Sequence, residues 1–176
     1  MTVVVVYESM YGNTHRIAEA IGHGLAGAGV PAEVLSVEAA RERGLGPEDV
    51  LVVGAPTHVH GLSRATTRQA AVQDAPGRAV EVDPSAQGEG VREWLGALDT
   101  HGGRAAAFDT RAKGPAVLTG RASQKIAKAL HQHGFELVAE PESFLVSSDN
   151  RLLPEELTRA RQWAADLATT IRPTQL

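Results

Sequence analysis

Residues 9–14, Ser-Met-Tyr-Gly-Asn-Thr, have the side-chain types that bind a phosphate group. The hydroxyls of Ser9 and Thr14 can donate hydrogen bonds to phosphate oxygens, and the small Gly12 between them lets the loop wrap around the group. The loop has no Lys and lacks G-x-G-x-x-G spacing, so it is neither a nucleoside-triphosphate loop nor a dinucleotide loop. We predict a site for one phosphate monoester. The alternative is an ordinary helix N-terminus that Ser, Asn and Thr side chains cap.

A strand before this loop and a helix after it would hold the site in place. Residues 3–6 are four consecutive valines, which predicts a strand that is buried on both faces inside a parallel sheet. Apolar residues then recur at helical spacing from Ile17 through Ala28. A strand, a short polar loop and a helix in this order direct backbone N–H groups and the positive end of the helix dipole toward an anion.

Two further loops follow predicted strands. The apolar run 49–54 ends in Gly and continues into the loop 55–61, and the small-residue run 104–108 continues into the loop 109–115. In a doubly wound parallel sheet, the loops at the carboxyl ends of neighbouring strands meet at the ligand crevice. The three loops are therefore expected to surround one site.

The remaining pattern alternates strands and helices. We expect a strand at 32–37, a short helix or loop at 39–46, a helix at 64–75, a long surface loop at 76–90, helices at 91–98 and 121–133, a fifth strand in two pieces at 135–138 and 142–146, and a helix from Pro154 onward. This order predicts an α/β fold with a doubly wound, five-stranded parallel sheet and helices on both faces, in a single domain over residues 1–176.

The loop 9–14 resembles the S/T-x-T-G-N-T phosphate loop of the flavodoxin family, which holds the ribityl phosphate of FMN. The match lies at Ser9, Gly12, Asn13 and Thr14. The loop departs from the family at Tyr11, where the flavodoxin-like quinone reductases are similar to this chain. Residues 54–61 resemble the G-x-P-T loop that lines the isoalloxazine ring in flavodoxins. The resemblance covers essentially the whole chain and implies strand order 2-1-3-4-5 and an FMN cofactor.

The resemblance also implies which residues contact FMN. These are Ser9, Met10, Tyr11, Gly12, Asn13 and Thr14 at the phosphate, Pro56, Thr57, His58, Val59, His60 and Gly61 on one side of the ring, and Asp109, Thr110, Arg111 and Gly114 on the other. His58 occupies the position of an aromatic ring that stacks on the flavin, or is an exposed loop residue. Gly61 either makes a peptide flip near flavin N5 easy or simply completes a turn. Asp109 either binds the polar edge of the ring or caps a local turn.

The third loop departs from the family because it offers no aromatic residue and carries Arg111 and Lys113, where flavodoxins have acidic neighbours. The formal charge of the whole chain is −4, so we expect weaker electrostatic steering than in strongly acidic flavodoxins. No basic run indicates nucleic-acid binding, and no apolar run reaches the roughly 20 residues of a membrane helix. The sequence contains no Cys, which excludes thiol chemistry and agrees with a cytoplasmic location.

The leading functional hypothesis is an FMN-binding, one-electron carrier that works between a flavoprotein reductase and an electron acceptor, with no catalytic residues of its own. One alternative is an NAD(P)H-dependent quinone reductase on the same fold, although no extra nucleotide-binding segment is evident. Another alternative is a binding module that has lost the flavin. His58 and His60 form an H-x-H pair, but no further ligand is fixed nearby by the sequence, so we expect no metal site. The sequence does not indicate the oligomeric state.

Overall fold

The first strand shows how this sequence forms a sheet that is buried on both faces. In β1 (Val3–Tyr7), Val3 and Val5 face one side and Val4 and Val6 face the other, because successive side chains of a strand alternate. All four valines are fully buried. The expectation of a two-sided, parallel sheet is confirmed at this strand.

The computed structural model describes residues 1–99 and 102–172. Its other strands are β2 (Ala32–Ser36), β3 (Val50–Pro56), β4 (Gly103–Ala112), β5 (Phe135–Leu137) and β6 (Glu142–Val146). The strand order is β2-β1-β3-β4-β5, every pair is parallel, and β6 also pairs with β4. Because β5 pairs with the start of β4 and β6 with its end, the two short strands together fill the fifth position. The predicted sheet order is confirmed.

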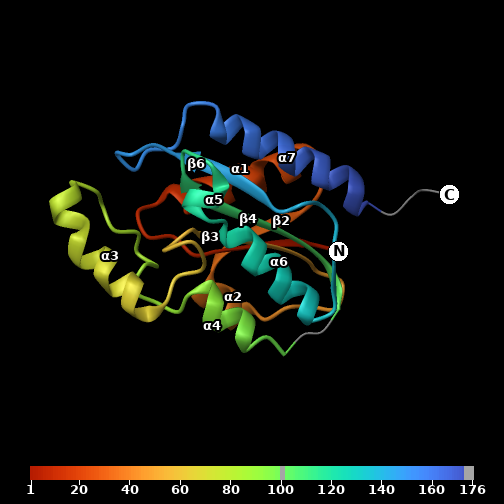
Figure 1. The fold of residues 1–176 in the computed structure, drawn as a ribbon. Helices are drawn as coiled ribbons and strands as arrows, with labels where there is room; N and C mark the ends of the chain where they lie inside the picture. The colour runs from red at the N-terminus through yellow and green to blue at the C-terminus, as the bar shows by residue number, and fades with distance from the viewer. Residues whose placement is uncertain (100–101, 173–176) are drawn as a thin grey trace.

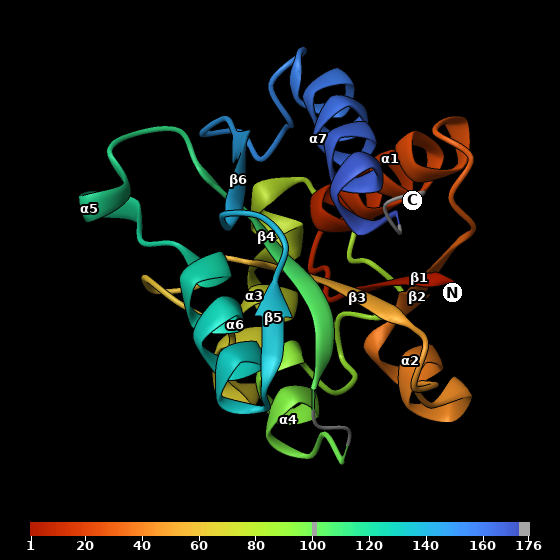
Figure 2. The same cartoon turned by 90° about the vertical axis from the view of Figure 1, so that its right-hand side faces the viewer.

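Helices cover both faces of this sheet (Figures 1 and 2). The helices of the described chain are α1 (Asn13–Gly27), α2 (Val37–Arg43), α3 (Ala65–Arg78), α4 (Val91–Gly96), α5 (Ala116–Thr119), α6 (Ala122–Gln132) and α7 (Glu156–Ile171). Helices α1 and α7 pack on the face that Val3 and Val5 enter, whereas α2, α4 and α6 pack on the face of Val4 and Val6. No helix in the described part of the chain is both long enough and apolar enough to cross a bilayer.

Helix α3 differs from the prediction in its length and its position. It does not end before Pro76 but continues through it to Arg78, and Ala79 ends it in the left-handed conformation at φ 52°. Proline is tolerated here because only its own N–H is lost, close to the end of a helix that buries little of its surface. In Figure 1, α3 lies beyond the carboxyl ends of the strands, where the loops after β1 and β3 emerge.

Residues 79–90 were expected to form part of a long surface loop. They are irregular, but Asp83 and Ala86 are buried. The Asp83 N–H donates to the Met10 carbonyl at 2.7 Å, and the Asp83 carboxylate lies 3.1 Å from His15 Nδ1. The Pro and Gly content correctly predicted irregular backbone. It could not reveal this docking, which joins residues about seventy positions apart in the sequence.

Strand β4 is longer than predicted. Asp109 to Ala112 were expected to begin a loop, but they continue the strand and pair with β6. At the same level of the sheet, a Cβ on Gly54 of β3 would lie only 2.0 Å from the Phe108 ring, so this close contact requires glycine. The loop after β4 therefore begins at Lys113, and it contains the short helix α5, which the sequence pattern did not predict.

Candidate functional site

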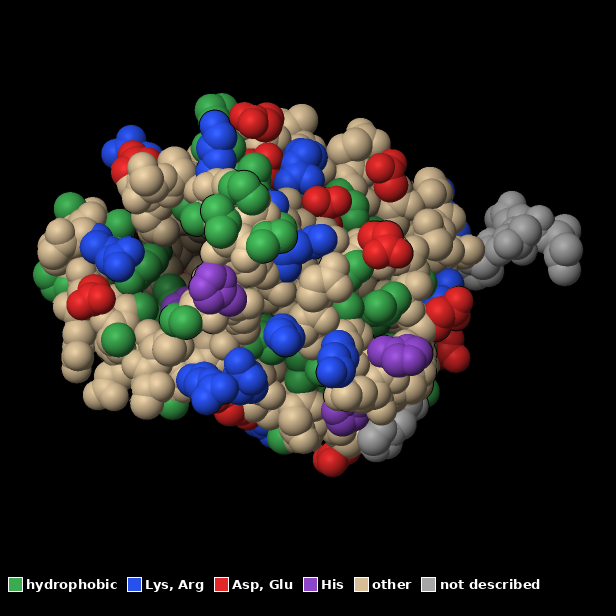
Figure 3. Space-filling view, in the orientation of Figure 1, with side chains coloured by type: hydrophobic (Ala, Val, Ile, Leu, Met, Phe, Trp, Pro, Cys, Tyr) green, Lys and Arg blue, Asp and Glu red, His purple; other side chains and the backbone are tan. Residues whose placement is uncertain are grey.

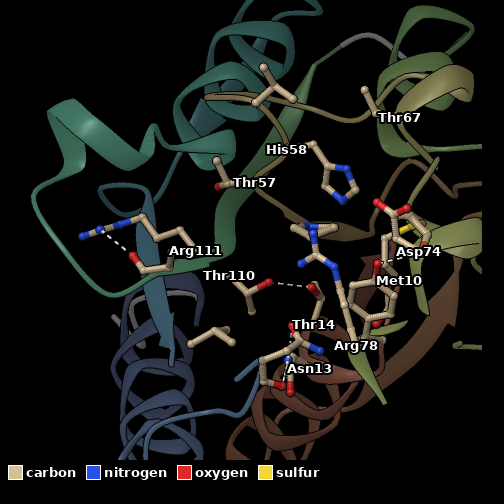
Figure 4. Close-up of a pocket in the computed structure, with 18 of the residues that line it drawn as sticks. Met10, Asn13, Thr14, Thr57, His58, Thr67, Asp74, Arg78, Thr110 and Arg111 are labelled. Atoms are coloured by element: carbon tan, nitrogen blue, oxygen red, sulfur yellow. Dashed lines mark hydrogen bonds between the residues drawn. The ribbon is translucent and has the colours of Figure 1, made fainter. Parts of the chain in front are cut away.

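A cavity of about 450 Å³ opens where the loops after β1 and β3 meet the end of β4 (Figure 4). The structure brings most of the predicted site residues to its wall: Ser9, Met10, Tyr11, Asn13, Thr14, Pro56, Thr57, His58, Val59, Thr110 and Arg111. Gly12 lies within the first loop. The wall does not include His60, Gly61, Asp109 or Gly114.

One end of the cavity is the N-terminus of α1, which has no cap of its own. No side chain caps it, and its first turn contains no acidic residue. Gly12 precedes the helix at φ 88°, a conformation that favours glycine, and a Cβ there would meet no atom within 4 Å. The first N–H groups of a helix have no partner within the helix, so this end presents free donors and the positive end of the helix dipole.

Three buried hydroxyls adjoin these N–H groups. Ser9 Oγ accepts a hydrogen bond from the Gly12 N–H at 3.0 Å, which leaves the hydroxyl proton of Ser9 available to a ligand. Thr14 Oγ1 and Thr110 Oγ1 lie 2.7 Å apart. Because only one of their two protons lies between the oxygens, the other remains free to donate. This donor set fits an anion such as a phosphate group.

The loop after β3 forms a tight turn beside the cavity. The N–H of His58 donates to the Gly61 carbonyl at 2.7 Å, and the N–H of Gly61 donates to the His58 carbonyl at 2.9 Å. The two central residues, Val59 and His60, have φ values of 44° and 67°, whereas Gly61 is not in the left-handed region. Both polar backbone groups of Gly61 are thus engaged. The unusual conformation lies at Val59 and His60, not at the glycine that the sequence singled out.

Val59 is under strain because a β-branched residue rarely adopts φ above zero. Its side chain is largely exposed, so truncation loses little packing. We expect Val59→Gly to raise the free energy of unfolding by about 1 kcal/mol. Val117→Gly is the matched control, since Val117 is equally exposed but helical, and there glycine should destabilise by about 0.5–1 kcal/mol. Urea unfolding measures both. A loss of stability in both variants would contradict strain at Val59.

Comparisons with known proteins agree with this geometry. A model of the flavodoxin family matches residues 5–110, which is more than half of the chain. The chain belongs to the flavodoxin family. No curated protein matches the sequence.

Solved structures show the same fold as this flavodoxin-family chain. A flavodoxin from the domain Archaea has a TM-score of 0.65 at 22% sequence identity, over 96% of this chain and 97% of that one. Oxidised flavodoxin 2 from Bacillus cereus has a TM-score of 0.63 at 17% identity, over 97% of this chain and 100% of that one. Rubredoxin oxygen:oxidoreductase from Desulfovibrio gigas has a TM-score of 0.55 at 18% identity, but only 35% of that chain is covered. At these identities the likeness concerns the fold.

Tyr11, the position that departs from the flavodoxin loop motif, holds α3 at the site. Its hydroxyl donates to the Ala71 carbonyl of α3 at 2.7 Å. Helix α3 thereby becomes a wall of the cavity, to which it contributes Thr67, Ala70, Ala71, Asp74 and Arg78. The sequence analysis missed this wall, because the link joins residues sixty positions apart.

Arg78 is the cation that points into the cavity. Figure 4 shows its guanidinium directed toward the space between His58 and the Thr14–Thr110 pair. No carboxylate in the described part of the chain forms an ion pair with it. Burial raises the pKa of Tyr11, and the nearby charge of Arg78 opposes that rise. The sequence pattern placed Arg78 in the predicted surface loop 76–90 and gave no signal that its side chain enters the cavity.

Arg111, in contrast, turns away from the centre of the cavity. Its Nη1 donates to the Gly114 carbonyl at 2.8 Å and to Thr119 Oγ1 at 3.1 Å, and Figure 4 shows the side chain directed at that loop. Lys113 is exposed. The two basic residues that depart from the flavodoxin pattern therefore lie at the rim of the cavity, and Arg78 supplies the positive charge inside it.

A fourth segment of this flavodoxin-family site was also missed. Val146 at the end of β6, and Ser147, Ser148 and Asn150 after it, line the cavity, and Asn13 Nδ2 donates to the Asn150 carbonyl at 2.9 Å.

His58 points into the cavity and is half-buried. Burial is the main cause that lowers the pKa of His58, and the charge of Arg68 lowers it further, which favours a neutral imidazole. In the described part of the chain, His58 and His60 belong to no group of three His, Asp or Glu side chains able to hold a metal ion.

Asp109 has a structural role in this chain. It is fully buried, and its Oδ2 accepts the N–H of Ser123 in the first turn of α6 at 2.8 Å. This contact caps the start of α6 and not a turn next to Asp109, and Asp109 does not line the cavity. Burial raises the pKa of Asp109, and hydrogen bonds from Ser123 and Ser143 offset that rise only in part.

The raised pKa predicts how stability depends on pH. A carboxyl whose pKa is raised by folding favours the folded state below its ordinary value of 3.8, and this contribution is lost as the pH rises through the folded pKa. Asp109→Asn should therefore stabilise the protein at pH 7, by about 1.4 kcal/mol per unit of raised pKa. The gain should disappear near pH 3.5. Urea unfolding at both pH values tests this, with Asp99→Asn as an exposed control. An equal effect of Asp109→Asn at both pH values would contradict it.

Proposed function

We propose that this chain binds FMN in the cavity and carries single electrons between redox proteins in the cytoplasm. The observation that carries the proposal is the open N-terminus of α1. It lacks a capping side chain and an acidic residue, and it faces a cavity whose other walls follow β3 and β4. An ordinary capped helix would not leave these donors free.

The residues present fit this cofactor. The hydroxyl of Ser9, the Thr14–Thr110 pair and the first N–H groups of α1 would hold the phosphate. A volume of about 450 Å³ lies within the roughly 300–1,000 Å³ of small-molecule sites. Pro56, Thr57, His58 and Val59 would face one side of the ring, and Thr110 the other, with Arg111 at the rim. FMN, when bound, supplies the redox chemistry, while the protein binds and orients it and limits access of water.

The second candidate function is an NAD(P)H-dependent quinone reductase. No extra nucleotide-binding segment was evident in the sequence, but α3 lies outside the sheet and forms an additional wall of the cavity. An enzyme of this kind needs a nicotinamide or quinone at near-contact distance from the flavin. In the proposed carrier, the partners are instead a flavoprotein reductase and an electron acceptor.

Steady-state kinetics separates the two candidates. We expect the FMN-loaded protein to be reduced rapidly by NADPH only when a flavoprotein reductase is added, because a carrier receives electrons from its partner protein and not by hydride transfer from a nicotinamide on the flavin. Oxidation of NADH and NADPH with benzoquinone, without reductase, should remain close to the rate of free FMN. Fast turnover in that reaction would overturn the carrier and make the protein a quinone reductase.

A further inference from the structure

The charges of this chain are distributed unevenly around the cavity. The whole chain has a formal charge of −4, yet residues 55–73 and 110–135 contain seven Lys and Arg and no Asp or Glu. The rest of the chain holds ten Lys and Arg against twenty-one Asp and Glu. The acidic excess therefore lies outside these two segments, which are basic, although Asp74, which follows the first segment, also lines the cavity.

The two segments meet at the mouth of the cavity. His60, in the turn after β3, forms a bridge with Gly120, which follows α5. Thr57 Oγ1 accepts the N–H of Ala122 at 3.0 Å, and a side-chain atom at Gly61 would lie 3.9 Å from Lys125 Cγ. The turn with Arg64 just beyond it, residues 111–120 with α5, and the exposed face of α6 thus form one continuous surface. Val59 and Arg111 belong both to this surface and to the cavity wall.

The cations on this surface are not neutralised by neighbours. Arg64, Lys113, Lys125 and Lys128 are exposed, and none of them forms an ion pair with a described residue. Arg68 is the exception, because it is buried and lies 3.2 Å from Glu93. Figure 3 shows basic side chains gathered on this face. Unpaired charges of one sign around a cleft attract a partner of the opposite sign over a long range.

Exposed apolar side chains lie among these cations. Val59, Val117 and Leu118 are 84%, 92% and 69% exposed, and together with Met1 they are the large hydrophobic residues exposed in the described part of the chain. Helix α5 buries none of its residues. Apolar side chains surrounded by charges are typical of protein–protein interfaces. Surfaces that bind single-stranded DNA or RNA rely on aromatic side chains that stack on the bases. No Phe, Tyr or Trp of this chain is exposed, so the surface favours a protein partner.

We propose that this surface, formed by residues 57–64, residues 111–120 with α5, and the exposed face of α6, docks a redox protein that carries an acidic patch around its own redox centre. The inference rests on the proposed function, since it places the partner over the mouth of the cavity. It reverses the arrangement of strongly acidic flavodoxins, which attract basic partners. A basic redox protein would be repelled from the same surface.

Binding to two small redox proteins of opposite charge tests the inference. The probes are a plant-type [2Fe–2S] ferredoxin, which is acidic, and cytochrome c, which is basic. Backbone amide shifts of the full chain are followed by NMR, with and without FMN, so docking is measured even if the chain binds no flavin. We expect ferredoxin to shift residues 57–61 and 113–128, and its affinity to fall about tenfold or more between roughly 20 and 300 mM salt.

Variants identify the cations responsible. Lys125→Gln/Lys128→Gln should weaken ferredoxin binding about fivefold to tenfold at low salt, whereas Arg161→Gln/Arg172→Gln, with the same charge change on the opposite face, should have little effect. Val117→Ser/Leu118→Ser should weaken binding at high salt as well. Tighter binding of cytochrome c, tighter binding of a single-stranded oligonucleotide, shifts elsewhere on the chain, or equal effects of the two charge variants would overturn the inference. Docking without FMN binding would contradict only the proposed function.

Discussion

Arg78→Met should weaken FMN binding by about tenfold to a hundredfold and leave riboflavin binding almost unchanged. The guanidinium of Arg78 points into the cavity and has no ion pair in the described part of the chain, so it is available to a dianionic phosphate. A hydrogen bond to a charged group contributes about 1.5–3 kcal/mol, and each 1.4 kcal/mol is about a tenfold change in Kd. Methionine keeps much of the apolar length, and riboflavin lacks the phosphate.

Arg64→Met is the control for Arg78→Met, because it removes the same charge from the other end of the same helix. Arg64 does not line the cavity. Fluorescence titrations of FMN and riboflavin measure all the affinities. If Arg64→Met had the same effect as Arg78→Met, or if both flavins were weakened equally, the phosphate contact of Arg78 would be wrong.

Thr14→Ala should weaken FMN by about tenfold or more and affect riboflavin much less. Thr14 is buried at the uncapped end of α1, and its hydroxyl is hydrogen-bonded to that of Thr110. One proton of this pair remains free to donate to a phosphate. The loss of one charge-assisted hydrogen bond accounts for about 1.5–3 kcal/mol. Thr66→Ala, an exposed Thr on α3 outside the cavity wall, is the matched control.

The Thr14 experiment needs a stability measurement beside it. Truncation leaves Thr110 Oγ1 without its partner, which should lower the free energy of unfolding by about 1 kcal/mol. At 25 °C the variant should therefore remain folded, and the affinities can be compared directly. Equal weakening of FMN and riboflavin by Thr14→Ala would mean that Thr14 does not contact a phosphate.

Strands and loops that are set by a short stretch of sequence were predicted correctly. The four valines of β1 sufficed for a strand buried on both faces. Residues 9–12 lie in the loop after that strand, and Asn13 and Thr14 begin α1. The two pieces of the fifth strand were also recognisable, because each is a short apolar run that a proline-containing segment separates. The order of the sheet came from the resemblance to flavodoxins, which the structure confirms.

Long-range contacts and side-chain directions could not be predicted in this way. The wall made by α3 depends on the bond from Tyr11 to Ala71, and the fourth segment of the site depends on the bond from Asn13 to Asn150. The direction in which the Asp109 side chain points depends on where β4 ends, and the run of small residues in the sequence does not determine that end. For the same reason the sequence selected Arg111 as the cation near the ring, whereas the structure places Arg78 in the cavity.

The most direct test of the central claim is a titration of FMN with the purified protein after any flavin has been removed. We expect saturable quenching of FMN fluorescence at one FMN per chain, with riboflavin bound at least about tenfold more weakly because it cannot use the phosphate donors at the N-terminus of α1. Equal affinity for FMN and riboflavin, or no saturable binding of FMN, would contradict it.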